Sequence, residues 1–148
     1  MKFLPITLTG VIALIVCFGV QGCKKDENKP KGDYTLLTQH KWKIAATKSI
    51  AEDGTETYPD ITACRADDIR DYETTGKFNL QVGGDLCYED ETSRSGTWEL
   101  KDYSKVLHMY VEGVGYYDEQ VEELSETALK IRYQVMDNTI EETYAPVK

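Results

Sequence analysis

Histidine is scarce in this chain, and the usual motifs of catalysis are missing. Its 148 residues include only two histidines, His40 and His108, which fall on different expected elements and have no nucleophile–base pattern beside them. Neither a glycine-rich phosphate loop nor an HExxH zinc motif occurs. We therefore expect a protein that is not an enzyme and that has no metal centre and no cofactor.

Basic residues are also few, because 17 lysines and arginines stand against 26 acids, for a formal net charge of −9. Such a surface repels phosphate backbones and anionic headgroups, so nucleic acid is a poor partner. Acidic clusters at 67–68, 85–91 and 118–119 could collect calcium, which takes about six to eight oxygen ligands. None has the alternating oxygen spacing of a calcium loop, so we interpret them as solvated charged loops.

Long apolar runs are confined to the N-terminus. Val11–Val20 is an unbroken run of ten apolar residues behind Lys2, which suits the core of a secretion signal and is short of the roughly 20 residues that span a membrane. The run ends at Val20-Gln21-Gly22-Cys23, which resembles the lipobox of bacterial lipoproteins. That resemblance implies cleavage before Cys23 and acylation of its thiol. The alternatives are an uncleaved anchor helix and an ordinary secretory cleavage.

The sequence thus divides into a signal peptide at 1–22, a lipidated cysteine with a flexible tether at 23–33, and a domain at 34–148. The tether has no apolar side chain whose burial could offset its ordering entropy. Its Lys25-Asp26-Glu27 cluster resembles the signal that sends some lipoproteins to the outer face of the cell, although an ordinary polar linker would look the same. We expect a monomer held at the outer membrane by the lipid on Cys23, facing either the periplasm or the exterior.

Two cysteines, Cys64 and Cys87, remain for the domain once Cys17 and Cys23 are assigned to the leader and its processing site. An exported chain meets an oxidising environment, so we expect them to form a disulfide. Such a bridge contributes about 3.5 kcal/mol in the chain-entropy model. Two buried free thiols are the alternative.

From Tyr34 onward the apolar residues alternate with polar ones, which indicates β-strands with one wet face. Residues 107–111 and 129–135 show the alternation most clearly. The eight expected strands are Trp42–Ser49, Ile69–Glu73, Lys77–Val82, Thr97–Leu100, Leu107–Val111, Gly115–Glu123, Leu129–Val135 and Thr139–Ala145. A single helical turn is expected at 33–39, with Asp33 as its N-cap. Short strands with hairpin-length links predict an all-β antiparallel barrel or sandwich.

Several segments in this order resemble the lipocalin-like lipoproteins of Gram-negative bacteria. They are Leu36-Leu37-Thr38, Lys41-Trp42-Lys43, Cys64 with Asp67-Asp68, Cys87, and Ser95-Gly96-Thr97-Trp98-Glu99-Leu100. The resemblance covers 34–148 and implies an eight-stranded antiparallel lipocalin-like barrel, closed at one end near Trp42. One departure is His40, which stands where lipocalins have a glycine, so closure around Trp42 is expected to differ in detail.

The aromatic side chains bear on function, because the chain has ten tyrosines and two tryptophans but only three phenylalanines. A barrel of this size is either filled by side chains or holds one small ligand. Our candidates for the inward, ligand-binding face are Trp42, Trp98, Met109, Ile131 and Tyr133. The leading hypothesis is a membrane-anchored protein whose barrel binds a small apolar or amphipathic ligand. The alternative is a surface interaction module with a filled barrel, which contacts a protein or a glycan; Tyr116-Tyr117 could form such a patch.

Overall fold

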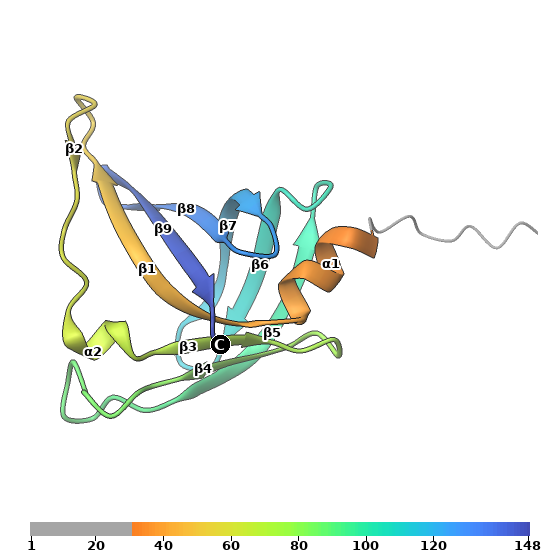
Figure 1. Ribbon diagram of the computed structural model, residues 1–148. Helices are drawn as coiled ribbons and strands as arrows, with labels where there is room; N and C mark the ends of the chain where they lie inside the picture. Colours follow the sequence, from red (N-terminus) through yellow and green to blue (C-terminus); the bar gives the residue numbers. More distant parts are fainter. Residues whose placement is uncertain (1–30) are drawn as a thin grey trace, which may run out of the picture.

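The computed structural model describes residues 31–148 (Figure 1). The predictions for the signal peptide, for Cys23 and for most of the tether lie outside the described residues. The elements are α1 (Lys31–Thr38), β1 (Lys41–Ile50), β2 (Glu56–Thr57), α2 (Ala63–Ala66), β3 (Ile69–Tyr72), β4 (Lys77–Gln81), β5 (Arg94–Lys101), β6 (Val106–Val111), β7 (Gly115–Leu124), β8 (Leu129–Val135) and β9 (Asn138–Pro146).

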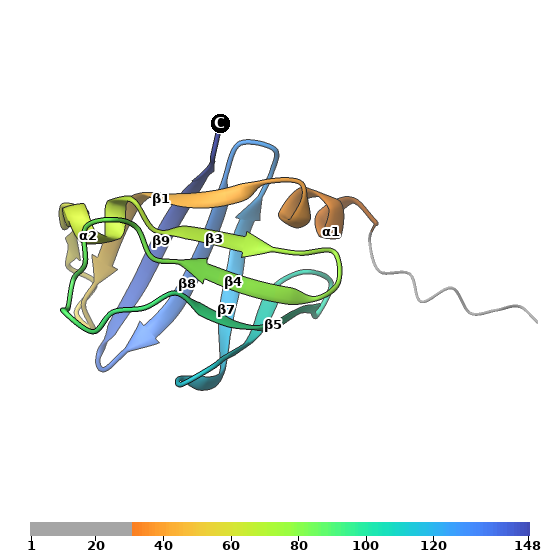
Figure 2. The same cartoon turned by 90° about the horizontal axis from the view of Figure 1, so that it is seen from below.

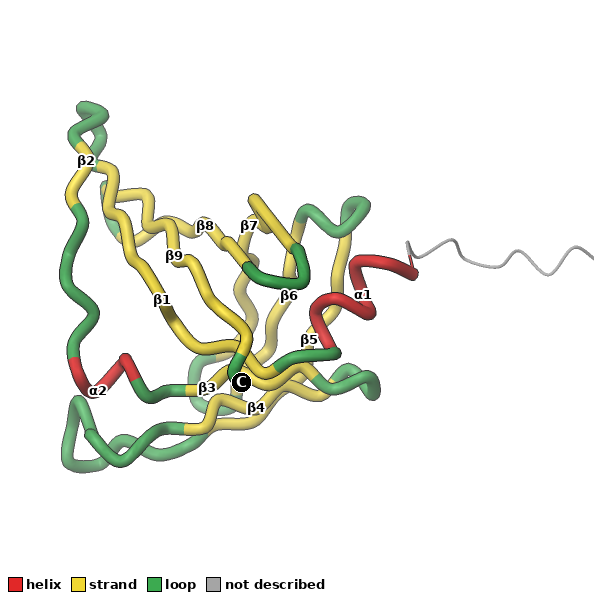
Figure 3. Tube along the Cα trace, in the orientation of Figure 1, coloured by secondary structure: helices red, strands yellow, loops and turns green. Residues whose placement is uncertain are grey.

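Eight of the strands close into one antiparallel barrel. Neighbours run in the order β1-β3-β4-β5-β6-β7-β8-β9, and β9 pairs back with β1 over Trp42 to Ile50, while the short β2 extends one end of β1 (Figures 1 and 3). Closure leaves no long edge strand unpaired, which removes the main route to edge-to-edge aggregation. The predicted eight-stranded all-β barrel is confirmed.

The period-two pattern of the sequence sets which side chains point inward. On β6, Leu107, Met109 and Val111 are buried, and Met109 lies opposite Trp98 of β5. On β8, Leu129 and Ile131 are buried, whereas Val135 at the end of the strand is 45% exposed. The core is therefore built from alternate residues of each strand, as the sequence predicts.

Helix α1 covers one end of the barrel, which we call the closed end (Figure 2). Leu37 of α1 is buried, and its carbonyl accepts a hydrogen bond from Nε1 of Trp42 at 2.9 Å. The ring of Tyr34 packs on Trp98 with centroids 4.9 Å apart. The backbone of His40 does not have a positive φ, so this position does not need a glycine. Its ring packs nearly perpendicular to that of Trp42, and a side chain is therefore accommodated where lipocalins have a glycine.

Two local predictions are corrected, and two short elements were not foreseen. Helix α1 begins at Lys31, so Asp33 lies in its first turn rather than at the N-cap. Packing of Leu37 on the barrel stabilises this short helix, which propensity alone would leave marginal. The elements β2 and α2 were not predicted, because two and four residues are too few to show a period. Strand β5 also starts three residues before the predicted Thr97, because Arg94 pairs with Leu80 of β4.

No helix within residues 31–148 has both the length and the apolar character needed to cross a membrane.

Candidate functional site

The antiparallel order brings four connecting segments to the end of the barrel opposite α1, which we call the open end. They are residues 51–68, 82–93, 112–114 and 136–137. Beneath the first two lies a cavity of about 340 Å³, which we call the open-end cavity. Its lining residues are Ile44, Arg65, Asp68, Arg70, Leu80, Val82, Cys87, Tyr88, Glu91, Thr92, Arg94 and Tyr144.

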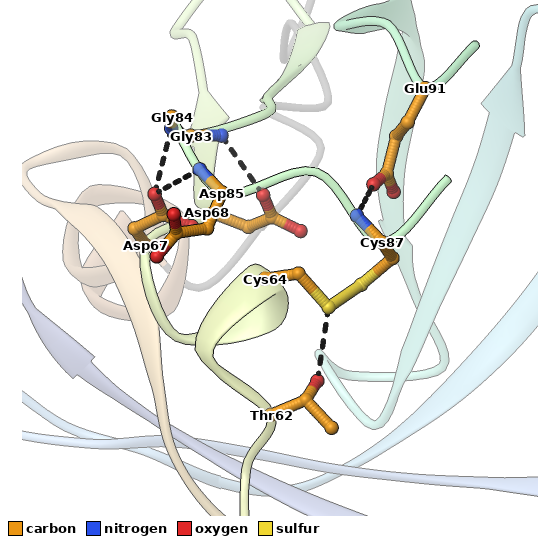
Figure 4. Close-up of a disulfide and its surroundings, with 9 residues drawn as sticks. All are labelled: Thr62, Cys64, Asp67, Asp68, Gly83, Gly84, Asp85, Cys87 and Glu91. Carbon is orange, nitrogen blue, oxygen red and sulfur yellow. Dashed lines mark hydrogen bonds between the residues drawn. A yellow bond between two sulfur atoms is a disulfide. The ribbon is translucent and has the colours of Figure 1, made fainter. Parts of the chain in front are cut away.

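The disulfide Cys64–Cys87 forms the roof of this cavity by joining α2 to the 82–93 segment (Figure 4). The predicted pairing is confirmed. The two cysteines flank the β3–β4 hairpin, so the bridge ties together the segments that enter and leave that hairpin. A covalent link at this point shortens the range over which the roof can move.

Backbone amides of the roof are held by carboxylates from the segment before β3 (Figure 4). Oδ2 of Asp67 accepts hydrogen bonds from the amides of Gly84 and Asp85, at 2.7 and 3.2 Å. Oδ1 of Asp68 accepts one from Gly83 at 3.1 Å. The approach requires glycine, because a Cβ on Gly83 would lie 2.0 Å from Cγ of Asp67.

Two carboxylates and one guanidinium lie inside the barrel below this roof. Nη1 of Arg70 donates to both carboxylate oxygens of Glu119, at 2.9 and 3.0 Å, and its guanidinium lies over the ring of Tyr144, 4.7 Å from the centroid. Burial raises the pKa of Glu119, although Arg70 acts in the opposite direction. Buried charges persist only when they are paired in this way.

The second carboxylate, Glu142, is fully buried and belongs to the same network. It accepts hydrogen bonds from Nη2 of Arg65 at 2.8 Å and from the hydroxyl of Tyr144. Burial opposes its ionisation, but Arg70, Tyr144 and Arg65 together lower its pKa. The interior of the barrel therefore carries charge as well as apolar packing.

Arg94 differs from the other two arginines of the cavity. Residues 31–148 offer it no hydrogen bond or ion pair. Two acids also line the cavity, but each already accepts a backbone hydrogen bond: Asp68 from Gly83 and Glu91 from Cys87, the latter at 2.7 Å. Arg94 is solvent-exposed, so the five donors of its guanidinium are free to bind a ligand in place of water.

A second hollow, which we call the closed-end groove, measures about 860 Å³ and lies on the outside of the barrel between α1, the β3–β4 turn and the β5–β6 hairpin. Its lining residues are Tyr34, Thr74, Thr75, Gly76, Thr97, Trp98, Glu99, Leu100, Lys101, Asp102, Tyr103, Ser104, His108 and Tyr116.

The five residues expected on the inward face are all directed to the core. Trp42, Met109 and Ile131 have no exposed surface and line neither hollow. Trp98 is 5% exposed and contributes to the closed-end groove, and Tyr133 is half-buried against the core with its pKa raised by burial and by Glu142. These side chains fill much of the barrel, and their part in ligand binding stays a prediction.

The charged residues of the interior were missed by sequence reasoning, although a signal for one was present. On β7 the inward set Tyr117, Glu119 and Val121 follows the same period-two pattern that marks the apolar strands. Applied to every residue type, the pattern would have placed Glu119 inside. The same holds for Arg70, which lies two residues before the buried Tyr72.

Among solved structures, the chain is similar to a lipocalin-like protein from Bacteroides uniformis ATCC 8492. The match covers 76% of this chain and 99% of that chain, with 16% sequence identity and a TM-score of 0.50. None of the protein-family models matches the chain, and no curated protein matches it significantly. The closed antiparallel barrel and this likeness together show that the chain has a lipocalin-like fold.

Proposed function

We propose that this chain is a membrane-anchored binding protein, without catalytic activity, whose open-end cavity holds a small amphipathic ligand with a single anionic group. The observation that carries the proposal is the unpaired Arg94 in a lining that also offers Arg65 and Arg70. Hydrogen bonds from a charged donor to a carboxylate or sulfate are about twice as strong as neutral ones.

The apolar part of the ligand would lie against the other wall. Ile44, Leu80 and Val82 line the cavity together with the rings of Tyr88 and Tyr144. A mostly apolar pocket with a few placed polar groups is the usual form of a small-molecule site. The combination favours an alkyl or aryl body with one charged head over a uniformly polar ligand.

The surface around the opening restricts the charge of the ligand. The four open-end segments contain twelve acidic residues and one base, Arg65, whereas the rest of 31–148 has twelve of each. The excess negative charge of the domain is thus gathered around the mouth. It repels polyanions more strongly than a ligand with a single negative charge, because the repulsion grows with the charge of the ligand.

The position of α1 supports a particular orientation at the membrane. A lipid on Cys23 would precede α1, and α1 lies at the closed end. An outer-membrane anchor would therefore join the barrel at its closed end, on the side away from the cavity. This attachment leaves the opening accessible to a ligand in the aqueous phase.

Calorimetric titration with three ten-carbon probes tests the charge preference. Decanoate, decanol and decyltrimethylammonium, each below its micelle-forming concentration, are added to the purified full chain. We expect decanoate to bind about tenfold or more tightly than the other two, and Arg94→Gln to remove that preference. Lys77→Gln, which changes an exposed lysine outside the cavity, is the matched control and should leave all three affinities unchanged.

Two results would contradict the proposal. One is equal binding of decanoate and decanol by the wild type. The other is an affinity for decanoate that Arg94→Gln and Lys77→Gln reduce to the same extent, because the loss would then follow net charge rather than this site.

A further inference from the structure

The closed-end groove is separate from the open-end cavity, lies on the outer surface, and plays no part in the function proposed above. From its lining we propose that it is a second binding site, which takes a short, neutral oligosaccharide. The argument rests on exposed aromatic faces, on a hairpin whose backbone holds one of them in place, and on polar side chains that have no partner within the described chain.

Two of the most exposed aromatic side chains in residues 31–148 belong to this groove. Tyr103 is 90% exposed and Tyr116 is 75% exposed, while Tyr34 lies deeper, against Trp98. Both rings line the same hollow, so their exposed faces are available to a ligand that enters it. The carbon-bound hydrogens on a sugar ring pack well on such faces.

Neighbouring rings hold Tyr116 in a defined orientation. His108 stacks on it with centroids 5.7 Å apart and planes inclined by 19°, and Tyr110 contacts it at 4.8 Å. His108 is itself fixed by its hydrogen bond to Asp118 on β7. The ring of Tyr116 is thus a supported platform rather than a freely rotating side chain.

Tyr103 is placed by an unusual backbone. Asp102, Tyr103 and Ser104 have φ values of 49°, 57° and 66°, the left-handed region that a bulky residue rarely adopts. No glycine relieves the β5–β6 turn. Strained positions of this kind cluster where binding or switching needs a side chain in one place. Here the turn directs the tyrosine to the rim of the groove.

The polar lining is rich in groups that suit sugar hydroxyls. Thr97, Glu99, Lys101 and Ser104 line the groove, and their side chains have no hydrogen bond or ion pair within residues 31–148. The lining contains a negatively charged side chain, Glu99, a positively charged one, Lys101, and two hydroxyl groups. The groove therefore has no strong preference for a cationic or an anionic ligand. A neutral ligand with many hydroxyls matches this mixture better than a charged peptide or a nucleic acid does.

The size of the hollow fits the same class. About 860 Å³ falls within the roughly 300–1,000 Å³ typical of small-ligand sites. The groove is bounded on three sides by α1, the β3–β4 turn and the β5–β6 hairpin and is open along the barrel surface, so a short linear chain of sugar rings can enter and continue beyond it.

Screening on an array of neutral and sialylated or sulfated oligosaccharides tests the inference, with the full chain purified in mild detergent. Neutral oligosaccharides of glucose, galactose, mannose or N-acetylglucosamine should give the signals. The best of them is then titrated by calorimetry. Tyr103→Ala and Tyr116→Ala should each weaken it about tenfold or more.

Tyr58→Ala is the matched control, because Tyr58 is 71% exposed but lies at the open end, so its removal should leave the affinity unchanged. Arg94→Gln should also leave it unchanged, which distinguishes this site from the cavity. The inference is overturned if no neutral oligosaccharide binds, or if anionic glycans bind more tightly than neutral ones. It is also overturned if Tyr58→Ala reduces the affinity as much as Tyr103→Ala does.

Discussion

Arg70 and Glu119 join opposite walls of the barrel. They lie 49 positions apart on β3 and β7, strands that are not neighbours in the sheet, and Nη1 of Arg70 donates to both carboxylate oxygens at 2.9 and 3.0 Å. Their side chains are only 15% and 3% exposed. The pair therefore bridges the interior and closes off the polar network beneath the open-end cavity.

Removing one member of this pair should lower the free energy of unfolding more than replacing both members with apolar residues. Arg70→Met leaves Glu119 buried without its partner, so we expect the free energy of unfolding to fall by about 3–5 kcal/mol. Arg70→Met combined with Glu119→Leu removes both charges of this pair and should recover part of the loss; the rest remains because Glu142 also loses its neighbouring guanidinium. Urea unfolding followed by tryptophan fluorescence measures the cycle, and losses that simply add would show that the two residues do not interact.

Acid should weaken the outer face of the barrel through Glu141. Ion pairs to Lys48, Lys130 and Arg132, at 2.9, 3.2 and 2.6 Å, surround this 3%-exposed carboxylate. Hydrogen bonding to Lys48, opposed by burial and aided by Arg132 and Lys130, lowers its pKa from 4.5 to about 2. A lowered carboxyl pKa stabilises the fold above the unfolded value, and that contribution is lost as the pH falls toward the folded one.

We therefore expect Glu141→Gln to lower the free energy of unfolding by about 1–2 kcal/mol at pH 7. This difference from the wild type should shrink progressively from about pH 4.5 down to pH 2. Glu122→Gln, which removes a single, more exposed partner of Arg132, is the control and should cost no more than about 0.5 kcal/mol. A difference between Glu141→Gln and the wild type that stays constant over this range would contradict the assignment.

Removing the disulfide should loosen both the fold and the cavity. Replacing Cys64 and Cys87 with alanine should lower the free energy of unfolding by about 2–4 kcal/mol. Because the bridge lies in the roof of the open-end cavity, decanoate binding should weaken as well. Reductant should reproduce both effects in the wild type and change nothing in the variant, as calorimetry and thermal unfolding can show. Two free thiols in periplasmically produced protein would disprove the bridge.

Gly96 of β5 has no room for a side chain against the backbone of β6. A Cβ there would lie 1.8 Å from the carbonyl oxygen of Tyr110, so Gly96→Ala must displace backbone and should cost about 3 kcal/mol or more. Gly84→Ala is the control, because a Cβ at Gly84 meets nothing within 4 Å. Thermal unfolding of the two variants should differ clearly, and equal melting temperatures would contradict the register of this pair.

The proposed anchor depends on Cys23, outside the described residues. Cys23→Ser should abolish incorporation of labelled palmitate and leave an unprocessed precursor in the membrane fraction. Cys17→Ser removes a cysteine that would leave with the signal peptide, so it should not affect labelling. Palmitate entering the Cys23→Ser protein would show that the lipobox interpretation is wrong.

Much of the fold could be predicted from the sequence because a strand imposes a local pattern on the residues that form it. Alternation along 107–111 and 129–135 follows from the two-residue period of a strand, and turn residues mark where each strand stops. The disulfide was readable because only one pair of cysteines remained for the domain. The start of α1 was not, since its stability comes from Leu37 packing on the barrel rather than from the helix itself.

The sequence by itself determined the eight strands of the barrel, their apolar inward positions and the disulfide between Cys64 and Cys87, because each depends on a short-range period or on elimination. Only the tertiary structure decided which charges meet inside the barrel: Arg70 reaches Glu119 across 49 positions, and Arg65 reaches Glu142 across 77. The period of a strand says that a side chain points inward but not what it faces. That depends on how the closed sheet curves and how its strands are staggered, and therefore on the whole barrel at once.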